Sequence, residues 1–523
     1  MATPDDPAAG QPPRGVAGVA AADPGRTAVV YEGRRLSFRA LDRAANAWAH
    51  RLADAGVGPG DRVALVMGNR PEYFAVWNGA ARLGALVVPV STRLTAPEMA
   101  YIVTDSASRV VVHGAAPVAA PVGAAAPGPS SGGAQAAAAA GHAGVPALVA
   151  DDLGFEDGRD DPPRTDFLGS PPATMTYTSG TTGRPKGIAR PAPPAADVAP
   201  PNPYAAFWGF GPDNVHLMCG PAYHTAPSAY AQMALGEGGT AVVMPRFDAA
   251  ECLRLIQEER VTTSQMVPAH FIRILEVDWQ SYDRSSIERI LHAAAPCPVP
   301  VKRKILEVFP PGTVWEFYGA SEGMASVVSP EEWLERPGTV GRPFPGVSVR
   351  VLDDDGDEVP TGEVGLLYIS SFSGQRFEYH NAPEKSAGAW VGDHFTVGDV
   401  GWVDGEGYVF LADRRTDLIL SGGVNVYPAE VETALIEDED VVDVAVFGLP
   451  DARMGQRVHA VVELRPGAPR DADALLARLA QRLADFKLPR TVEFVDELPR
   501  EPNGKVLKAR LRQERVRAAD GST

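Results

Sequence analysis

Cysteine, lysine and long apolar runs are all scarce in this chain of 523 residues. Its three cysteines, Cys219, Cys252 and Cys297, stand far apart, which argues against a disulfide framework or a zinc site and favours buried neutral thiols. No apolar run is long enough to cross a bilayer, and the N-terminus, with Asp5 and Asp6, lacks the basic stretch and apolar core of a signal peptide. These absences predict a soluble, cytoplasmic protein with no membrane span.

Positive charge is in deficit as well. The 48 lysines and arginines stand against 66 aspartates and glutamates, which gives a formal net charge of -18. A sequence-independent nucleic-acid binder normally carries a basic stripe, so nucleic acid is not an expected partner. Nucleotide binding is compatible with this charge, because local loops and fixed dipoles hold phosphates whatever the overall charge. Only seven lysines occur, and two of them, Lys186 and Lys505, lie in motifs rich in glycine or proline.

Apolar residues make up 45% of the chain, and its length is too great for one compact core, so at least two domains are expected. Hydrophobic periodicity predicts a helix over 37–56, with Ser37 as its N-cap and Gly56 as its stop. Further helices are predicted over 71–83, 96–104 and 249–259, and strands over 62–67, 85–90, 109–113, 174–177, 240–244 and 262–267. Strands that alternate with helices in this way are typical of a parallel sheet covered on both faces.

Two segments depart from that alternation. Residues 114–147 are mostly Ala, Gly, Pro and Ser, without the bulky apolar side chains that offset the entropy of ordering, and are predicted to form a mobile surface loop. The tail has the elements of a small separate domain. Its predicted strands cover 441–447, 458–464 and 491–495, and its helix covers 471–484. The boundary is expected near 415–420, with domains at 1–415 and 416–523.

The strongest local signal is a stretch rich in Gly and Thr directly after a predicted strand: Thr178, Ser179, Gly180, Thr181, Thr182, Gly183, Arg184, Pro185, Lys186 and Gly187. Glycines let the backbone approach a ligand closely, hydroxyls supply donors, and the lysine adds a positive point charge. These are the parts of a polyphosphate cradle. It is not a Walker A loop, because glycine follows the lysine where that motif has Ser or Thr. A plain flexible linker would need neither the strand nor the lysine.

This stretch resembles the phosphate loop of the adenylate-forming superfamily, which contains acyl-CoA synthetases, luciferases and peptide-synthetase adenylation domains. Further motifs of that family follow in the family's order along nearly the whole chain. The resemblance implies an α/β fold with a large N-terminal domain of layered sheets and a small, mobile α+β C-terminal domain. The active site would lie in the cleft between them, with ATP held by Thr178 to Gly183 and by Lys186.

Tyr318-Gly319-Ala320-Ser321-Glu322-Gly323 is similar to the family's adenine and phosphate element, with serine in place of its threonine. The resemblance implies that Tyr318 stacks on adenine beside Gly319, that Ser321 contacts the α-phosphate, and that Glu322 helps to hold magnesium. A carboxylate beside a triphosphate needs a divalent cation between them, which suits that role.

Two other stretches resemble the rest of the nucleotide pocket. In the stretch 292–297, the resemblance implies that Ala294, Ala295 and Pro296 form the backbone wall of the adenine pocket. Asp399, in Gly398-Asp399-Val400-Gly401, matches the aspartate that accepts hydrogen bonds from the ribose hydroxyls, and Arg414 matches the arginine that contacts ribose and phosphate. In isolation, each would be taken for an ordinary turn or surface residue.

Residues 413–432 resemble the family's hinge and the following loop, which lines the pantetheine channel of thiol-transferring members. Gly422 and Gly423 would permit that close approach. The hinge residue is usually Asp or Lys but is Thr416 here, which puts the balance between the two domain orientations in question. Lys505, in Pro-Arg-Glu-Pro-Asn-Gly-Lys, matches the lysine that reaches the carboxylate oxygen and the α-phosphate. A cation placed between two reacting anions lowers the barrier to their reaction.

The acyl side is represented by residues 221–227, Pro-Ala-Tyr-His-Thr-Ala-Pro, in which His224 stands where amino-acid-activating relatives carry an aspartate for the substrate ammonium. An α-amino acid is therefore not the expected substrate. The pattern resembles synthetases for fatty, aromatic or alicyclic acids, in which this histidine gates the thiol channel. A hydrogen-bonded structural histidine is the alternative interpretation of His224. Residues 292–299 and 329–343 are similar to actinobacterial acyl-CoA synthetases of fatty, steroid or terpenoid acid metabolism.

The sequence thus predicts an AMP-forming ligase that uses ATP and Mg²⁺ to activate a non-amino carboxylic acid as acyl-AMP and then passes it to the thiol of coenzyme A. One alternative hands the acyl group to a carrier protein or a separate partner enzyme. Another is a non-catalytic regulatory relative that binds AMP or ATP, but such a protein would not need Lys505. A Rossmann dehydrogenase is disfavoured, because no Gly-x-Gly-x-x-Gly stands between a strand and a helix with an acidic residue at the expected distance. The motifs leave the acid, the owner of the thiol and the oligomeric state open.

Overall fold

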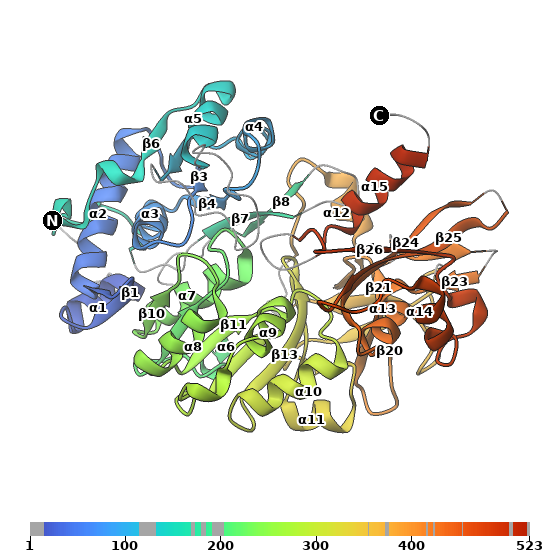
Figure 1. Cartoon of the computed structure of the whole chain (residues 1–523). Helices are drawn as coiled ribbons and strands as arrows, with labels where there is room; N and C mark the ends of the chain where they lie inside the picture. The colour runs from blue at the N-terminus through green and yellow to red at the C-terminus, as the bar shows by residue number, and fades with distance from the viewer. Residues whose placement is uncertain are drawn as a thin grey trace. The chain divides into compact units, whose positions relative to one another are not determined.

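The structure is a computed structural model that describes residues 15–114, 132–168, 173–178, 185–190, 203–353, 355–371, 376–414, 417–421, 424–451, 453–500 and 506–519. The chain divides into two compact units (Figure 1). The first consists of residues 1–266, 277–291 and 377–387, and the second of residues 267–276, 292–376 and 388–523.

The first unit contains two largely parallel sheets. One has the order β6-β5-β3-β4-β7-β8, in which only the edge strand β8 runs antiparallel to its neighbour. Its strands are β3 (Arg62–Val66), β4 (Leu86–Pro89), β5 (Val110–His113), β6 (Ala147–Val149), β7 (Ala173–Thr178) and β8 (Lys186–Arg190). The other contains β11 (Thr263–Met266), β9 (Val215–Met218), β10 (Thr240–Val243) and β1 (Thr27–Tyr31), all parallel, with β2 (Arg34–Ser37) antiparallel to β1. The parallel sheet expected from the alternation is therefore present.

The helices of the first unit are α1 (Gly15–Ala22), α2 (Phe38–Asp54), α3 (Pro71–Arg82), α4 (Ala96–Asp105), α5 (Gly132–Ala143), α6 (Pro203–Phe207), α7 (Thr225–Gly236) and α8 (Ala249–Glu258). The predicted start of α2 is confirmed, because the Ser37 side chain accepts a hydrogen bond from the Ala40 N–H at 3.2 Å. Its stop is confirmed at Gly56, whose φ of 81° suits glycine.

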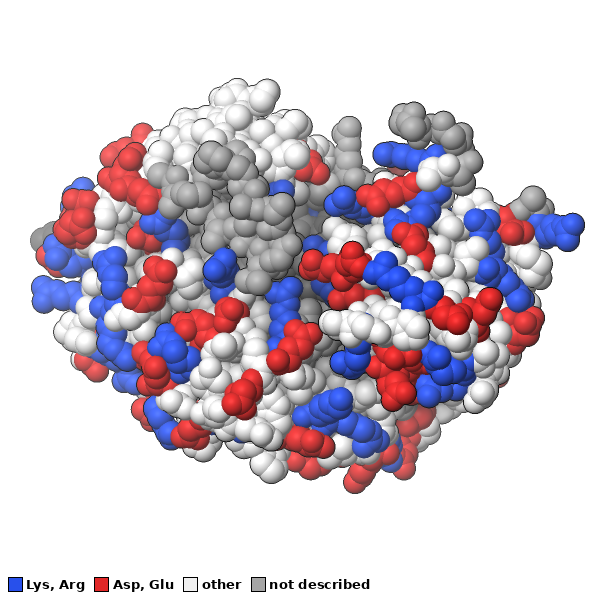
Figure 2. All heavy atoms as spheres, viewed as in Figure 1, with Lys and Arg blue, Asp and Glu red and all other residues white. Residues whose placement is uncertain are grey.

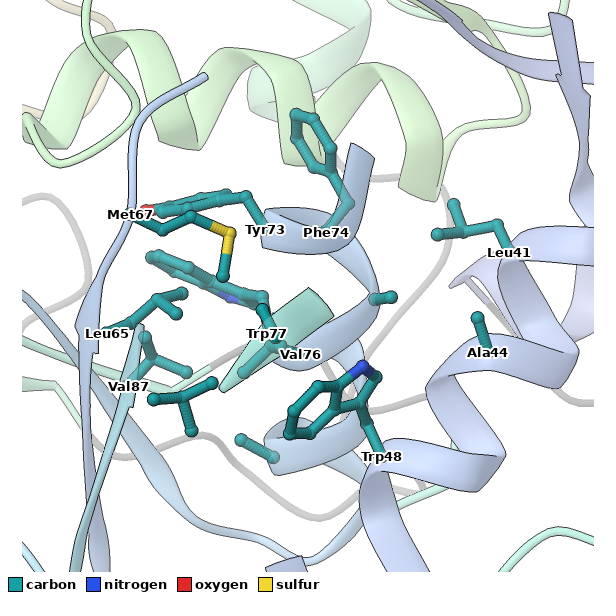
Figure 3. Close-up of a cluster of buried hydrophobic side chains, with 14 of the residues drawn as sticks. Leu41, Ala44, Trp48, Leu65, Met67, Tyr73, Phe74, Val76, Trp77 and Val87 are labelled. Carbon is teal, nitrogen blue, oxygen red and sulfur yellow. The ribbon is translucent and has the colours of Figure 1, made fainter. Parts of the chain in front are cut away.

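Helices α2 and α3 share the large hydrophobic core that Figure 3 shows, with Trp48 and Trp77 near its centre. Both indoles are at most 3% exposed. The two helices approach closely at Gly79, where a Cβ atom would lie 2.7 Å from the Cβ of Trp48. Glycine at this one position therefore allows α3 to pack against α2.

The prediction of a structureless loop over 114–147 is wrong for its second half. Residues 132–143 form α5 and residues 147–149 form β6, whereas residues 115–131 lie outside the described part. Ala136, Ala139 and Ala140 are buried against the core that contains α4. Alanine has the highest helix propensity, and these small side chains at helical spacing form a stripe that packs without bulky residues.

The second unit contains an antiparallel sheet in the order β18-β19-β17-β20-β21-β15-β14-β13, with β16 antiparallel to β17. Its strands are β13 (Val314–Ala320), β14 (Gly323–Val328), β15 (Thr339–Pro343), β16 (Val349–Leu352), β17 (Gly365–Ser370), β18 (Trp390–Val391), β19 (His394–Phe395), β20 (Asp399–Val403) and β21 (Val409–Arg414). Helices α9 (Pro268–Leu275), α10 (Val299–Val308) and α11 (Pro330–Glu335) also belong to this unit. Strand β12 (Arg289–His292) and helix α12 (Pro383–Gly388) span the division between the units.

The tail of the second unit has its own sheet, in the order β23-β22-β25-β24, with β26 parallel to β25. Its strands are β22 (Ile419–Ser421), β23 (Val424–Val426), β24 (Val441–Asp451), β25 (Gly455–Leu464) and β26 (Thr491–Val495), and its helices are α13 (Pro428–Ile436), α14 (Ala472–Leu479) and α15 (Lys508–Ala519). Buried residues from β24, β25, α13 and α14 form a core of their own. The limits 1–415 and 416–523 for the two domains stay a prediction.

Two of the three cysteines, Cys219 and Cys252, are buried as expected, but Cys297 is partly exposed because it lies in an irregular segment between β12 and α10. Among the residues described, no helix has the length and apolar character needed to cross a membrane. Figure 2 shows acidic and basic side chains interspersed over the face in view.

Candidate active site

The Gly- and Thr-rich stretch lies between two antiparallel strands. β7 ends at Thr178, β8 begins at Lys186, and these two residues are register partners across the pair. The expected strand before the stretch is therefore present. Ser179, Gly180, Thr181, Thr182 and Gly183 lie outside the described residues, as does the side chain of Thr178, while Lys186 is partly exposed.

The base of this hairpin is held by contacts from distant parts of the first unit. The carbonyl of Gly187 accepts a hydrogen bond from the His380 N–H at 2.8 Å, and Ile188 forms an antiparallel bridge with Tyr379. The Tyr177 hydroxyl donates to Asp105 Oδ2 at 2.7 Å, and burial followed by the nearby carboxylate raises the pKa of that phenol, so it stays a donor. These contacts fix the position of β7 and β8 at the point where the Gly- and Thr-rich stretch connects them.

The predicted wall of the adenine pocket follows β12. Ala294 and Pro296 are exposed, Ala295 is partly exposed, and Ala294 has a φ of 77°. For a residue with a Cβ atom, the left-handed region costs about 1–2 kcal/mol. Such local strain clusters at ligand sites, where the surrounding structure holds the backbone in place.

A buried ion pair that was not predicted from the sequence lies beside His292, two residues before this wall. The ammonium of Lys302, on α10, donates to Glu316 Oε2 on β13, and it sits 4.6 Å from the centre of the Trp333 ring. Lys302 is 0% exposed and Glu316 6%. Burial raises the pKa of Glu316 against the opposing effect of Lys302, and it lowers the pKa of His292, whose Nε2 lies 3.7 Å from Glu316 Oε2. The sequence offered only one signal for this pair, the presence of Lys302 in a lysine-poor chain.

Three predicted nucleotide residues come together in the second unit. The buried hydroxyl of Tyr318, on β13, donates to Asp399 Oδ2, on β20, at 2.7 Å. Asp399 is in turn the register partner of Arg414 on β21, although the side chain of Arg414 is outside the described part. An aromatic ring, a carboxylate and the backbone of an arginine thus meet where the sequence predicted an adenosine site.

Ser321 and Glu322 form the turn between β13 and β14, and both are partly exposed. The turn is tight, because a Cβ atom at Gly319 would lie 2.7 Å from the carbonyl oxygen of Gly323. Among the described residues, no group of three or more His, Cys, Asp or Glu side chains is arranged to hold a metal ion. Glu322 still fits magnesium, which is commonly held by one or two carboxylates together with substrate phosphates.

His224 lies in the first unit, at the N-cap of α7. Its backbone N–H donates to the Pro221 carbonyl at 3.0 Å, and its own carbonyl accepts from the Ser228 N–H at 3.4 Å. The Nε2 atom is buried and has no hydrogen-bond partner among the described residues. Burial, followed by the charge of Arg93, lowers the pKa of the imidazole to about 4, so His224 is neutral near pH 7. Most buried polar groups have a partner, so this nitrogen is available to a ligand, but the choice between a gating and a structural histidine stays a prediction.

Lys505, Thr416, Gly422 and Gly423 lie outside the described residues. Arg500 and Val506, on either side of the Lys505 segment, form an antiparallel bridge.

Comparison with known proteins places these observations in a family. The family described as AMP-binding enzyme matches residues 16–374, and the AMP-binding enzyme C-terminal domain matches residues 430–505. The chain is 34% identical over 514 residues to the fatty acid–[acyl-carrier-protein] ligase ScoC of Streptomyces coeruleorubidus, covering 94% of this chain and 93% of that protein. It is 33% identical over 493 residues to the long-chain-fatty-acid–CoA ligase FadD13 of Mycobacterium tuberculosis, covering 92% and 93%.

Among solved structures, ATP-bound MatB from Rhodopseudomonas palustris is 30% identical, with a TM-score of 0.80 over 96% of this chain and 97% of that one. This likeness confirms the predicted α/β fold class with a large N-terminal and a smaller C-terminal domain. The chain therefore belongs to the AMP-binding enzyme family, within the adenylate-forming superfamily, and is an acid–thiol ligase that activates acyl groups with ATP.

Proposed function

We propose that this enzyme converts a non-amino carboxylic acid to its acyl-AMP and then to a thioester of coenzyme A. The observation that carries the proposal is the hydrogen bond between Tyr318 and Asp399, with Arg414 in register beside Asp399. This contact joins two residues 81 positions apart that the sequence assigns to one adenosine site, and so supports an adenylating activity. The proposed acid is fatty, aromatic or alicyclic, because the neutral imidazole of His224 offers no negative charge to pair with a substrate ammonium.

In the adenylation step, the proposed nucleotide site comprises Tyr318 with the 294–296 wall at adenine, and Asp399 and Arg414 at ribose. Residues 178–183, Lys186 and Ser321 bind the phosphates. Glu322 would hold magnesium, which supplies charge neutralisation between the phosphates when it is bound. Lys505 bridges the attacking carboxylate and the α-phosphate, and pyrophosphate leaves.

In the second step, the C-terminal domain, with its proposed boundary at 415/416, rotates about Thr416. That motion removes Lys505 from the phosphate and brings Gly422 and Gly423 to the thiol channel, where His224 serves as the gate. A carboxylate is a poor electrophile, whereas the mixed anhydride with AMP carries a good leaving group, so dividing the reaction is chemically sensible. Closing the site between steps keeps water from the anhydride.

A carrier-protein thiol is the second candidate acceptor, favoured by the likeness to ScoC, whose name states an acyl-carrier-protein product. The two acceptors separate in one assay. Thioester formation with coenzyme A and no second protein supports the first candidate, and formation only with a holo-carrier protein supports the second.

The first experiment is pyrophosphate exchange into ATP, with and without magnesium, across fatty, benzoic, steroid and terpenoid acids, with amino acids as controls. We expect exchange that depends on magnesium and on one class of non-amino acid. Exchange that depends on an amino acid would contradict the proposal. So would the absence of exchange with every acid tested, if ATP still binds.

The second experiment separates the half-reactions. Lys505→Ala should abolish exchange but spare thioester formation from supplied acyl-AMP. Lys508→Ala is the matched control, because this nearby lysine pairs with Glu432 at 2.7 Å. Equal loss of both half-reactions in Lys505→Ala would refute the separate roles.

A further inference from the structure

The turn that carries His224 connects β9 to α7 and covers residues 219–224. It packs closely against the start of α7, because a Cβ atom at Gly220 would lie 2.7 Å from Cγ of Pro227. Within the turn, the His224 N–H donates to the Pro221 carbonyl at 3.0 Å. Other backbone polar groups of the turn are satisfied by side chains from outside it. These side chains are Tyr73, on α3, and Asn69, two residues before that helix begins.

Both polar atoms of the Asn69 amide form hydrogen bonds in this region. Its Nδ2 donates to the Gly220 carbonyl at 2.9 Å and to the Met244 carbonyl at 2.8 Å, and its Oδ1 accepts from the Ala222 N–H at 2.7 Å. Asn69 is 7% exposed, so water does not compete freely for these bonds. One side chain thus ties both sides of the turn to the end of β10.

Tyr73, four residues after Asn69 and on α3, also contacts the 219–224 segment. Its hydroxyl donates to the Ala222 carbonyl at 2.7 Å and lies 3.2 Å from Oγ of Ser228, on the first turns of α7. The side chain is fully buried, and Figure 3 shows it beside Met67 and Trp77. Together, Asn69 and Tyr73 satisfy both the N–H and the carbonyl of Ala222, two residues before His224.

We propose that Asn69 and Tyr73 are positioning residues that fix the 219–224 turn and thereby hold the imidazole of His224 in the orientation that its role requires. This inference rests on the role proposed above for His224. Both residues reach only the backbone of the turn, so they act on its geometry without touching substrate. Because His224 Nε2 is buried and its backbone is held on both sides, a shift of Ala222 moves the imidazole with it.

The variants are Asn69→Ala and Tyr73→Phe, each with a matched control from the same unit. Tyr230→Phe removes a buried hydroxyl that lies 3.0 Å from the Tyr204 hydroxyl. Asn214→Ala removes a buried amide that donates to Thr262 and Thr263. Tyr73→Phe is nearly isosteric, so it tests the proposal even where Asn69→Ala lowers the yield of folded protein.

The first readout is hydrogen–deuterium exchange in the peptide covering residues 219–224, which needs no turnover. We expect faster exchange in Asn69→Ala and Tyr73→Phe than in the wild type or the two controls. Unchanged exchange in both variants would overturn the proposal, whatever the reaction of the enzyme is.

The second readout is thioester formation from supplied dodecanoyl-AMP and coenzyme A, compared with pyrophosphate exchange. A misplacement near 1 Å costs up to about 100-fold, so we expect a fall of about 10- to 100-fold in thioester formation and less than about threefold in exchange. Combining Tyr73→Phe with His224→Ala should add no further loss to that of His224→Ala alone. Equal losses in both half-reactions, or additive losses, would overturn the positioning role. An unimpaired His224→Ala would instead refute the role proposed for His224.

Discussion

The buried ion pair between Lys302 and Glu316 gives the sharpest energetic prediction. The change is Lys302→Met, which keeps most of the apolar stem but leaves the Glu316 carboxylate without its cation. Lys302 is 0% exposed and Glu316 6%, so solvent screens neither charge. Breaking one partner of a buried pair costs about 3–5 kcal/mol, because it leaves a buried charge uncompensated. Loss of the contact with the Trp333 ring adds to that cost.

The double variant Lys302→Met with Glu316→Leu should recover most of the loss, since a buried pair replaced by apolar residues of similar volume is often neutral. Urea unfolding of wild type, both single variants and the double variant measures the four free energies of unfolding. The functional consequence is measurable as well. Glu316 and Tyr318 are buried on the same face of β13, so we expect a raised KM for ATP in the single variants and near-normal KM in the double variant.

The reasoning is refuted if each single variant loses less than about 1 kcal/mol, or if the double variant is as unstable as the worse single one. Exposed Lys304, two residues from Lys302 on α10, provides the matched control as Lys304→Met. Its replacement should stay within about 0.5 kcal/mol of wild type.

Two further predictions concern pH and a single methyl group. Burial lowers the pKa of His216 from 6.5 to about 3, so the unfolded chain takes up a proton before the folded one; stability is full above pH 6.5 and falls as pH drops toward 3. Urea unfolding gives the free energy of unfolding at pH 8 and at pH 5, and we expect the fall between them to be about 2 kcal/mol smaller in His216→Gln than in the wild type. An equal fall in both proteins would contradict this prediction. In Gly319→Ala, the added Cβ would lie 2.7 Å from the Gly323 carbonyl oxygen and 2.9 Å from Cα of Met324. We expect a loss of about 1–3 kcal/mol and weaker ATP binding by calorimetry, whereas Gly405→Ala, which meets no atom within 4 Å, should be nearly neutral; equal effects would count against the backbone clash.

The parts of the fold that sequence predicted are those in which local signals agree with tertiary packing. Helix α2 has a regular apolar stripe, a serine cap and a glycine stop, and its predicted span differs from the observed one by two residues or fewer at either end. Strand β26 was predicted at Thr491–Val495, as observed. By contrast, α14 was predicted to continue to residue 484 but ends at Leu479. No glycine follows Leu479 to mark that end in the sequence.

The antiparallel sheet of the second unit escaped prediction because most of its strands are connected by turns or loops, with the short helices α11 and α12 in two of the connections, so the regular alternation of strand and helix is missing. Many of them alternate buried and partly exposed residues, as in β13, and short runs of that kind carry a weaker signal than the continuous apolar runs of β3 or β5.

The residues of the candidate site also fall into two groups, those that a motif identifies and those that only tertiary contacts reveal. Motif resemblance named Tyr318, Asp399 and His224 from the types and order of residues. It did not find Asn69 or the pair of Lys302 with Glu316, because their partners depend on tertiary contacts that neither periodicity nor a motif reports. Asn69 contacts residues about 150 and 175 positions away. A buried polar side chain gives no sequence signal of which backbone groups it will satisfy.

The contacts at the base of the phosphate hairpin have a consequence for synthesis on the ribosome. Gly187 and Ile188 pair with His380 and Tyr379, which belong to the same compact unit but are made much later. At about 5–20 residues per second, the ribosome needs on the order of 10–40 s to advance from one set of partners to the other. During that interval, β8 has an unpaired edge, and the Asp105 carbonyl lacks its later partners, the side chains of His380 and Asn381. The nascent chain therefore completes its first unit only after residues 267–276 and 292–376 of the second have been made, so a stalled or truncated chain ending before residue 377 exposes that edge to aggregation.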